Sequence, residues 1–135
     1  MTGLGFADRP VIPRLPLLSR WTAARRKLAG TYRAQLDGAR ITVPPECDRG
    51  HVYHLFPVLV DNRDAFQAHL VSEGVGTLVH YPVAIPRQPA MADLPPAVCP
   101  VADRVASQVV SLPLHPALSA SDQAFVSAAV QRWRP

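Results

Sequence analysis

The sequence predicts a two-layer α+β domain in which about four short strands pack against helices. Apolar patterns of helical and of strand period alternate along the 135 residues, and proline, glycine and capping residues separate them. No strand pattern leads into a glycine-rich turn and a helix, which excludes a doubly wound nucleotide-binding fold. The length corresponds to one domain, and a composition of 48% hydrophobic and 18% charged residues is typical of folded globular proteins.

The first predicted element is a helix over residues 17–36. Residues 1–14 contain two glycines and two prolines, so we expect an irregular lead-in there and assign residues 15–135 to the domain. Pro16 suits the first turn of the helix, and Gly38 suits the position after its end. The apolar positions lie along one helical face: Leu17, Trp21, Ala24, Leu28, Tyr32 and Leu36.

Basic side chains occupy the rest of this helix. They are Arg20, Arg25, Arg26, Lys27 and Arg33. One interpretation is a solvated helix face, which is the common role of such charges. The other is a docking face for a partner.

The middle of the chain predicts strands over residues 40–43 and 51–60, a helix, and a strand over residues 75–81. Asp61 or Asn62 is expected to cap the helix, and Gly74 is expected to end it in a left-handed conformation. His51 and His54 would point to opposite faces of a strand, so they do not predict a shared metal site.

The last third predicts a long proline-rich loop over residues 82–96, a helix over residues 100–108 with Val101 and Val105 facing inward, and a strand over residues 109–112. Ser119 with Asp122 forms a capping box for a final helix. The expected buried stripe of that helix is Phe125, Val126, Ala129, Val130 and Trp133.

Charge and cysteine content limit the partners and the compartment. The net charge of +4 is modest, and aromatic residues do not alternate with the arginines, so we do not expect nucleic acid as a partner. Cys47 and Cys99 lack CxxC spacing and are expected to be unpaired thiols. No apolar run approaches the roughly 20 residues of a membrane span, and no signal segment is evident, so we expect no membrane contact and a cytoplasmic location.

Three segments carry a resemblance to a known family. They are Gly74 to Pro89, with His80-Tyr81-Pro82 and Gln88-Pro89; His51-Val-Tyr-His-Leu-Phe56; and Val110-Ser-Leu-Pro-Leu-His-Pro116. Together the segments resemble the C-terminal part of the DegT/DnrJ/StrS sugar aminotransferases, from about Pro16 to Trp133. The resemblance implies the small domain of a fold-type I aminotransferase, which uses pyridoxal phosphate (PLP) to place amino groups on nucleotide-linked keto-sugars.

The resemblance also implies a substrate site. In the family, the loop after the His-Tyr pair lies near the sugar nucleotide, which implies substrate-binding roles for His80, Tyr81 and Gln88, while the adjacent Arg87 could reach a diphosphate. Ala84, Ile85 and Pro86 depart from the family pattern, and Pro86 replaces a histidine that would be a donor near the substrate. A structural role for His80 and Tyr81 at the end of the sheet is the alternative.

The covalent chemistry of the family is missing from these residues. PLP chemistry needs a lysine amine, a carboxylate that protonates the pyridine nitrogen, and a phosphate cradle. Lys27 is the single lysine and belongs to the polar side of a helix, so we expect this chain alone to bind no cofactor and to contain no catalytic or metal-binding residue.

Two forms of the family interpretation remain open, together with one alternative from another class. The chain is either half of a split enzyme whose partner polypeptide carries the PLP-binding large domain, or a truncated and inactive remnant. In both forms the surface that faces the large domain would be exposed, so we expect self-association. The alternative is a small non-catalytic binding or regulatory module that uses its arginine-rich helix.

Overall fold

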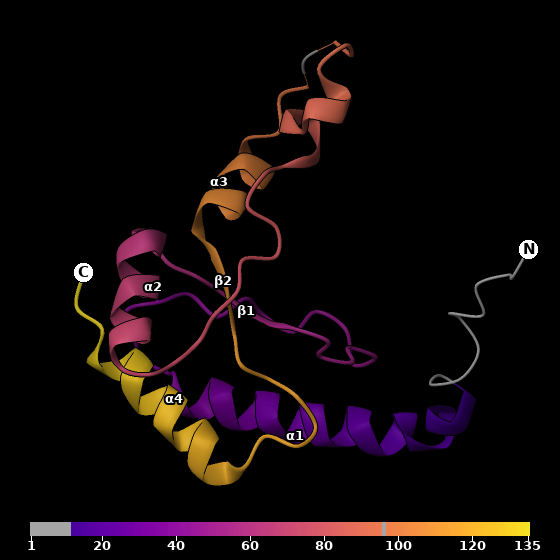
Figure 1. Cartoon of the computed structure of the whole chain (residues 1–135), viewed down its shortest axis with the longest axis vertical. Helices are drawn as coiled ribbons and strands as arrows, with labels where there is room; N and C mark the ends of the chain where they lie inside the picture. Colours follow the sequence, from indigo (N-terminus) through magenta and orange to yellow (C-terminus); the bar gives the residue numbers. More distant parts are fainter. Residues whose placement is uncertain (1–11, 96) are drawn as a thin grey trace, which may run out of the picture.

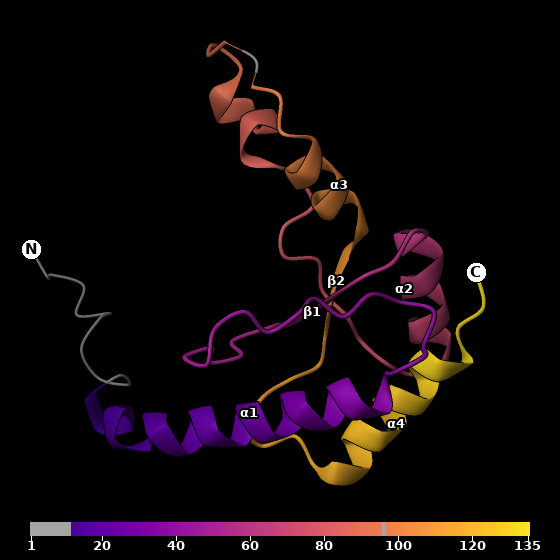
Figure 2. The same cartoon turned by 180° about the vertical axis from the view of Figure 1, so that it is seen from behind.

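The computed structural model describes residues 12–95 and 97–135, which form four α-helices around a two-stranded antiparallel sheet (Figures 1 and 2). The helices are α1 (Leu18–Gln35), α2 (Arg63–Ser72), α3 (Pro100–Gln108) and α4 (Ala120–Arg132). The strands are β1 (Phe56–Leu59) and β2 (Val109–Leu112), and short 3-10 turns span Ile12–Leu17, Ile85–Arg87 and Pro89–Met91. The α+β prediction is confirmed, while most of the expected lead-in, residues 1–11, lies outside the described residues.

The predicted strand over residues 40–43 is reduced to a single bridge between Thr42 and Leu59 of β1. Thr42 and Leu59 exchange both main-chain hydrogen bonds, each of 2.8 Å. In the same register the next such pair would be Pro44 and Pro57, and neither proline has an N–H to donate. The ladder therefore cannot extend past Thr42 in that direction.

The predicted strand over residues 75–81 is also wrong as a strand, because only Leu78 pairs, with Ser111 of β2. On one side the register would bring Gly76 opposite Pro113, which has no N–H. On the other side it would bring His80 opposite Val109, whose N–H is already donated to Val105 O at the end of α3. The four expected strands are thus two strands, each flanked by one bridge.

The long strand predicted over residues 51–60 begins only at Phe56. Tyr53 has a φ of +48°, which is incompatible with an extended ladder, although its side chain is buried. The preceding loop is held by α1: Arg25 Nε donates to Val52 O at 2.8 Å, and Arg26 Nε donates to His51 O at 2.9 Å. Two arginines of the basic helix face therefore bind the main chain of the protein itself.

The predicted helix ends are confirmed. Asn62 Oδ1 accepts from the N–H of Ala65 at 3.2 Å, and Ser119 Oγ accepts from the N–H of Asp122 at 3.0 Å. Gly74 has a φ of +79° after α2, the left-handed conformation that ends a helix at low cost only for glycine.

The core lies between the sheet and helices α1, α2 and α4, and one face of the sheet contributes Phe56, Val58, Val110 and Leu112 to it. The helices and the residues that directly follow α1 and α4 contribute Ala29, Tyr32, Leu36, Phe66, Leu70, Val126, Ala129, Val130 and Trp133. Helix α4 packs across the C-terminal half of α1 (Figure 1). Two predicted core positions are wrong: Phe125 on α4 and Val101 on α3 are 51% and 64% exposed.

Tyr32 joins α1 to the chain after β2, because its hydroxyl donates to Pro113 O at 2.8 Å. Burial raises the pKa of Tyr32 well above its ordinary value. A raised folded-state pKa contributes stability that is present below the unfolded-state pKa, about 10, and is lost as the pH rises beyond it.

Tyr32→Phe is expected to lower the free energy of unfolding at pH 7 by about 1–2 kcal/mol, because the Pro113 carbonyl loses its donor. The same variant should lose less stability than the wild type between about pH 9 and pH 11, because its ring does not ionise. Urea denaturation of the variant and the wild type at pH 7, and again across the range from about pH 9 to pH 11, measures the two effects. An equally steep alkaline loss in the variant would contradict the assignment to Tyr32.

Residues 82–95 and 97–108 project from the body as an arm, which contains the Ile85–Arg87 and Pro89–Met91 turns and returns through α3 (Figures 1 and 2). The loop predicted over residues 82–96 is therefore partly ordered into turns. Among the helices that the structure describes, none is long and apolar enough to cross a membrane.

Candidate functional site

The base of the arm encloses two adjoining hollows that share His80. One, of about 530 Å³, lies between the segment around Tyr81 and Ile85 and the side of α3 that carries Val105. The other, of about 400 Å³, lies along β2 and is lined by Leu78 and Ser111, among others. The His80 ring therefore stands between two open cavities, where it can reach a ligand from either.

His80, Tyr81 and Gln88, three of the four residues predicted to bind substrate, line the larger hollow. His80 is half-buried, and its Nδ1 lies 3.0 Å from Ser111 Oγ. The Tyr81 ring is 75% exposed and stands edge-on to the His80 ring, with 5.9 Å between their centroids. Gln88 Nε2 donates to Val83 O at 3.1 Å, which leaves its amide oxygen free to accept.

The fourth predicted residue, Arg87, points elsewhere. Its guanidinium donates to both carboxylate oxygens of Asp103 on α3, at 3.3 and 3.1 Å. The hydrogen bonds that Arg87 donates to the Asp103 carboxylate raise the pKa of Arg87 above its ordinary value. Arg87 thus ties the turn to α3 beside the hollow, and half of its side chain stays exposed.

Sequence reasoning missed Ser111 and Asp103 as members of this site. Ser111 lies in the middle of a buried strand, and Asp103 lies on a helix, 16 positions after Arg87 in the chain. A serine among apolar strand residues was the available signal for the first. No local sequence signal indicated Asp103, because its contact with Arg87 depends on how the arm folds back.

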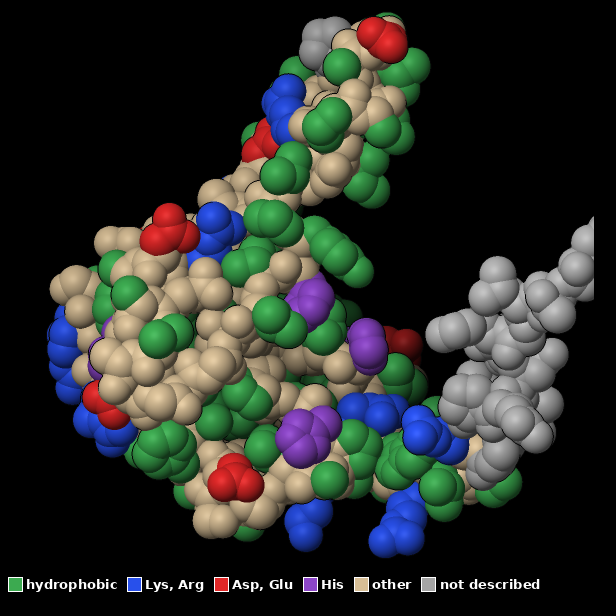
Figure 3. Space-filling view, viewed as in Figure 1, with side chains coloured by type: hydrophobic (Ala, Val, Ile, Leu, Met, Phe, Trp, Pro, Cys, Tyr) green, Lys and Arg blue, Asp and Glu red, His purple; other side chains and the backbone are tan. Residues whose placement is uncertain are grey.

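The arm carries an unusual amount of exposed apolar surface. Its exposed large apolar side chains are Val83, Ile85, Leu94, Val98 and Val101, and the exposed Tyr81 directly precedes it. Figure 3 shows such side chains gathered along the arm, with histidines on the body below it. A surface of this kind marks an interaction site more often than a solvated face.

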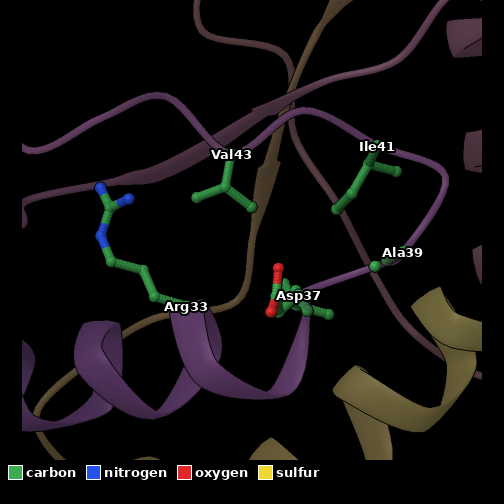
Figure 4. A pocket seen from close by; sticks show the side chains of 7 residues that line it. Arg33, Asp37, Ala39, Ile41 and Val43 are labelled. Carbon is green, nitrogen blue, oxygen red and sulfur yellow. The ribbon is translucent and has the colours of Figure 1, made fainter.

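A further hollow, of about 280 Å³, lies at the C-terminal end of α1 (Figure 4). Arg33 extends from α1 toward the segment that carries Val43 (Figure 4). Asp37 and Ile41 also line this hollow. The Arg33 guanidinium donates to Tyr53 Oη at 3.4 Å and lies 6.0 Å from the centre of that ring. Arg33 therefore packs on the aromatic core and is not a free cation.

No group of three or more potential metal ligands occurs among the residues that the structure describes. His51 and His54, which the strand pattern placed on opposite faces, are both exposed in the irregular segment before β1.

Comparison with known proteins identifies the chain. Residues 11–131 match the DegT/DnrJ/EryC1/StrS aminotransferase family. The chain belongs to this family. It is 39% identical over 121 residues to UDP-2-acetamido-2-deoxy-3-oxo-D-glucuronate aminotransferase of Pseudomonas aeruginosa, a match that covers 89% of this chain and 33% of the relative.

Solved structures of family members share the fold. DesV from Streptomyces venezuelae superimposes with a TM-score of 0.85 at 37% identity, over 90% of this chain and 34% of DesV. NtdA from Bacillus subtilis, solved with its cofactor PMP, gives a TM-score of 0.73 at 31% identity, over 83% of this chain and 28% of NtdA. This DegT-family chain therefore spans about a third of the length of these relatives.

The residues of this DegT-family chain do not fit a covalently held PLP. Lys27, its single lysine, is exposed on α1 next to Arg26, which is bound to the loop before β1. A lysine that bonds a cofactor needs an enclosed site that orients its amine and excludes water. No step of cofactor chemistry is therefore assigned to Lys27.

Proposed function

We propose that this chain forms the C-terminal, small-domain side of a nucleotide-sugar aminotransferase site, and that another part of the enzyme holds PLP. The observation that carries the proposal is the hollow at the base of the arm, where His80, Tyr81 and Gln88 converge in a chain of this family. The Pseudomonas aeruginosa relative, by its name, acts on a sugar attached to UDP. A nucleoside diphosphate sugar is accordingly the proposed ligand.

Each side chain contributes a different interaction. Tyr81 offers an exposed ring on which a base or sugar can stack, and His80 offers a ring nitrogen for a polar ligand atom. Arg87 supplies a cation for the diphosphate once its guanidinium turns from Asp103. Gln88 supplies an amide oxygen that accepts from a sugar hydroxyl.

The exposed arm is the proposed contact surface for the cofactor-binding part of the enzyme. Val98 is 87% exposed and Ile85 is 71% exposed, and burial of apolar area is the main favourable term in association. Without that part, we expect copies of the chain to associate through the same surface, and sizing should give a mass above that of a monomer.

The proposal is compatible with two forms of the protein: half of a split enzyme that works with a partner polypeptide, or a truncated and inactive remnant. Pro86, in the Ile85–Arg87 turn where the family pattern has a histidine, favours the remnant because it removes a donor near the ligand. A chimera distinguishes the two forms, since it supplies the missing part directly.

The chimera replaces the matching third of the Pseudomonas aeruginosa enzyme with residues 11–131 of this chain. We expect it to bind PLP, with the visible absorbance of the bound cofactor, and to turn over the sugar nucleotide of the parent enzyme. Loss of turnover with retained cofactor would indicate a remnant, and loss of both would remove the proposed domain role.

Lys27→Arg in the same chimera is the control. Because Lys27 is exposed on α1, the variant should keep both the bound cofactor and the turnover. The proposal would be overturned if the chain alone bound PLP and borohydride fixed the cofactor to Lys27.

A further inference from the structure

The Ser111 side chain lies in an unusual place for a polar group. Ser111 is 5% exposed on β2, between Val110 and Leu112, which point into the core. Its N–H donates to Leu78 O at 2.7 Å, and its carbonyl accepts from the N–H of Leu78 at 3.4 Å. Both main-chain groups of Ser111 are thus hydrogen-bonded, so its hydroxyl is the polar group whose partner must be identified.

The hydroxyl faces His80. Successive side chains of a strand point to opposite faces, so Ser111 points away from the core and toward the base of the arm. Its Oγ lies 3.0 Å from Nδ1 of His80, and within the described residues this is the sole partner of the hydroxyl. The contact joins β2 to the segment that forms both hollows.

The position of the proton follows from this single partner. If Nδ1 carried the proton, it would donate to Oγ, and the hydroxyl proton would have no acceptor among the described protein atoms. Leaving a buried donor unpaired costs roughly 1–3 kcal/mol. The favourable arrangement has the Ser111 O–H donating to Nδ1, so the neutral His80 ring carries its proton on Nε2.

The second ring nitrogen is available for a ligand. Nε2 lies on the other side of the ring from Ser111, forms no hydrogen bond within the described residues, and is not among the atoms that are buried without a partner. His80 lines both hollows, so its free N–H can be reached from either.

We propose that Ser111 is a positioning residue that fixes His80 as an Nε2–H donor. His80 would then select an acceptor oxygen, such as a phosphate or carbonyl oxygen, and would not serve as an acceptor for a ligand hydroxyl. The identity of the ligand as a nucleoside diphosphate sugar rests on the proposed function, but the proton position does not.

Two other histidines serve as internal standards. His69 Nε2 lies 2.9 Å from Ala129 O, and a carbonyl only accepts, so Nε2 of His69 carries a proton. His51 Nδ1 accepts from the N–H of Tyr53 at 3.1 Å, which also leaves the proton on Nε2. His54 and His115 are exposed and provide unrestrained references.

The experiment is a long-range proton–nitrogen correlation spectrum of the ¹⁵N-labelled chain near pH 8.5, where an ordinary imidazole is neutral. His80 should show the Nε2–H pattern of His51 and His69. Ser111→Ala should move His80 to the averaged pattern of His54 and His115. A wild-type His80 with its proton on Nδ1, or a His80 pattern unchanged by Ser111→Ala, would overturn the proposal.

Two matched variants separate the hydroxyl from general effects on folding. Ser127→Ala removes another buried hydroxyl, one that donates to Gln35 at 2.6 Å, and should leave the His80 pattern unchanged. Ser111→Thr retains a hydroxyl and should retain the Nε2–H pattern. An effect of Ser127→Ala equal to that of Ser111→Ala would assign the change to packing and overturn the role of Ser111.

Titration with UDP in the same spectra keeps the two proposals distinct. We expect UDP to shift the Nε2 and Hε1 signals of His80 and to bind several-fold more weakly to Ser111→Ala. If the His80 proton is on Nε2 as expected but UDP shifts no signal of the arm, the role of Ser111 stands and the proposed ligand fails.

Discussion

Replacing Phe56 with alanine is expected to lower the free energy of unfolding by about 3–5 kcal/mol. Phe56 is 1% exposed, and its ring centroid lies 5.0 Å from that of Tyr32 and 6.4 Å from that of Tyr53. The truncation leaves a cavity where the sheet, α1 and the loop before β1 meet. A total stability of roughly 5–15 kcal/mol is usual, so the variant should be close to unfolding at 37 °C.

Phe125→Ala is the matched control, because it removes the same atoms from an exposed position on α4. Phe125 is 51% exposed, and the change should cost less than about 1 kcal/mol. Guanidinium denaturation followed by circular dichroism measures both variants. Equal losses for the two phenylalanines would contradict the placement of the core.

The helices were predictable because their signals are local. Asn62, Gly74 and Ser119 act on main-chain groups within four residues, so their effect can be read from the sequence. The inward face of each helix was less predictable. Phe125 fits the apolar stripe of α4 by spacing, but about half of the residue remains exposed in the described chain.

The strands were harder to predict because a strand needs a partner with free main-chain groups. Residues 75–81 have strand-forming side chains, yet Pro113 and the bonded N–H of Val109 limit their pairing with β2 to Leu78. Strand propensity cannot reveal this restriction, because it arises from residues some 30 positions away.

The site was predictable as a segment but not as a set of contacts. The segment from His80 to Gln88 was identified from its resemblance to the family, and the structure places three of its four candidate residues on one hollow. The partners Ser111 and Asp103 come from β2 and α3, and only the fold brings them near. The basic helix face was ambiguous for the same reason, since the carbonyls that Arg25 and Arg26 bind lie 27 and 25 residues away.

Arg87→Ala is expected to weaken UDP binding to the chimera about ten- to a hundredfold, because charge-assisted hydrogen bonds to the diphosphate are lost. Asp103→Asn should act in the opposite direction. It releases Arg87 from the carboxylate that now accepts at 3.3 and 3.1 Å, and should strengthen binding by up to about fivefold, as expected for an exposed ion pair. Isothermal titration with UDP measures both variants.

The direction of the two effects separates a ligand-binding arginine from a structural one. Both substitutions remove the ion pair between Arg87 and Asp103, so if that ion pair only holds the turn against α3, both should weaken binding. Only a cation that reaches the ligand makes the effects differ in sign. Arg104→Ala, which removes a neighbouring exposed cation from α3, should change the affinity little and so controls for net charge.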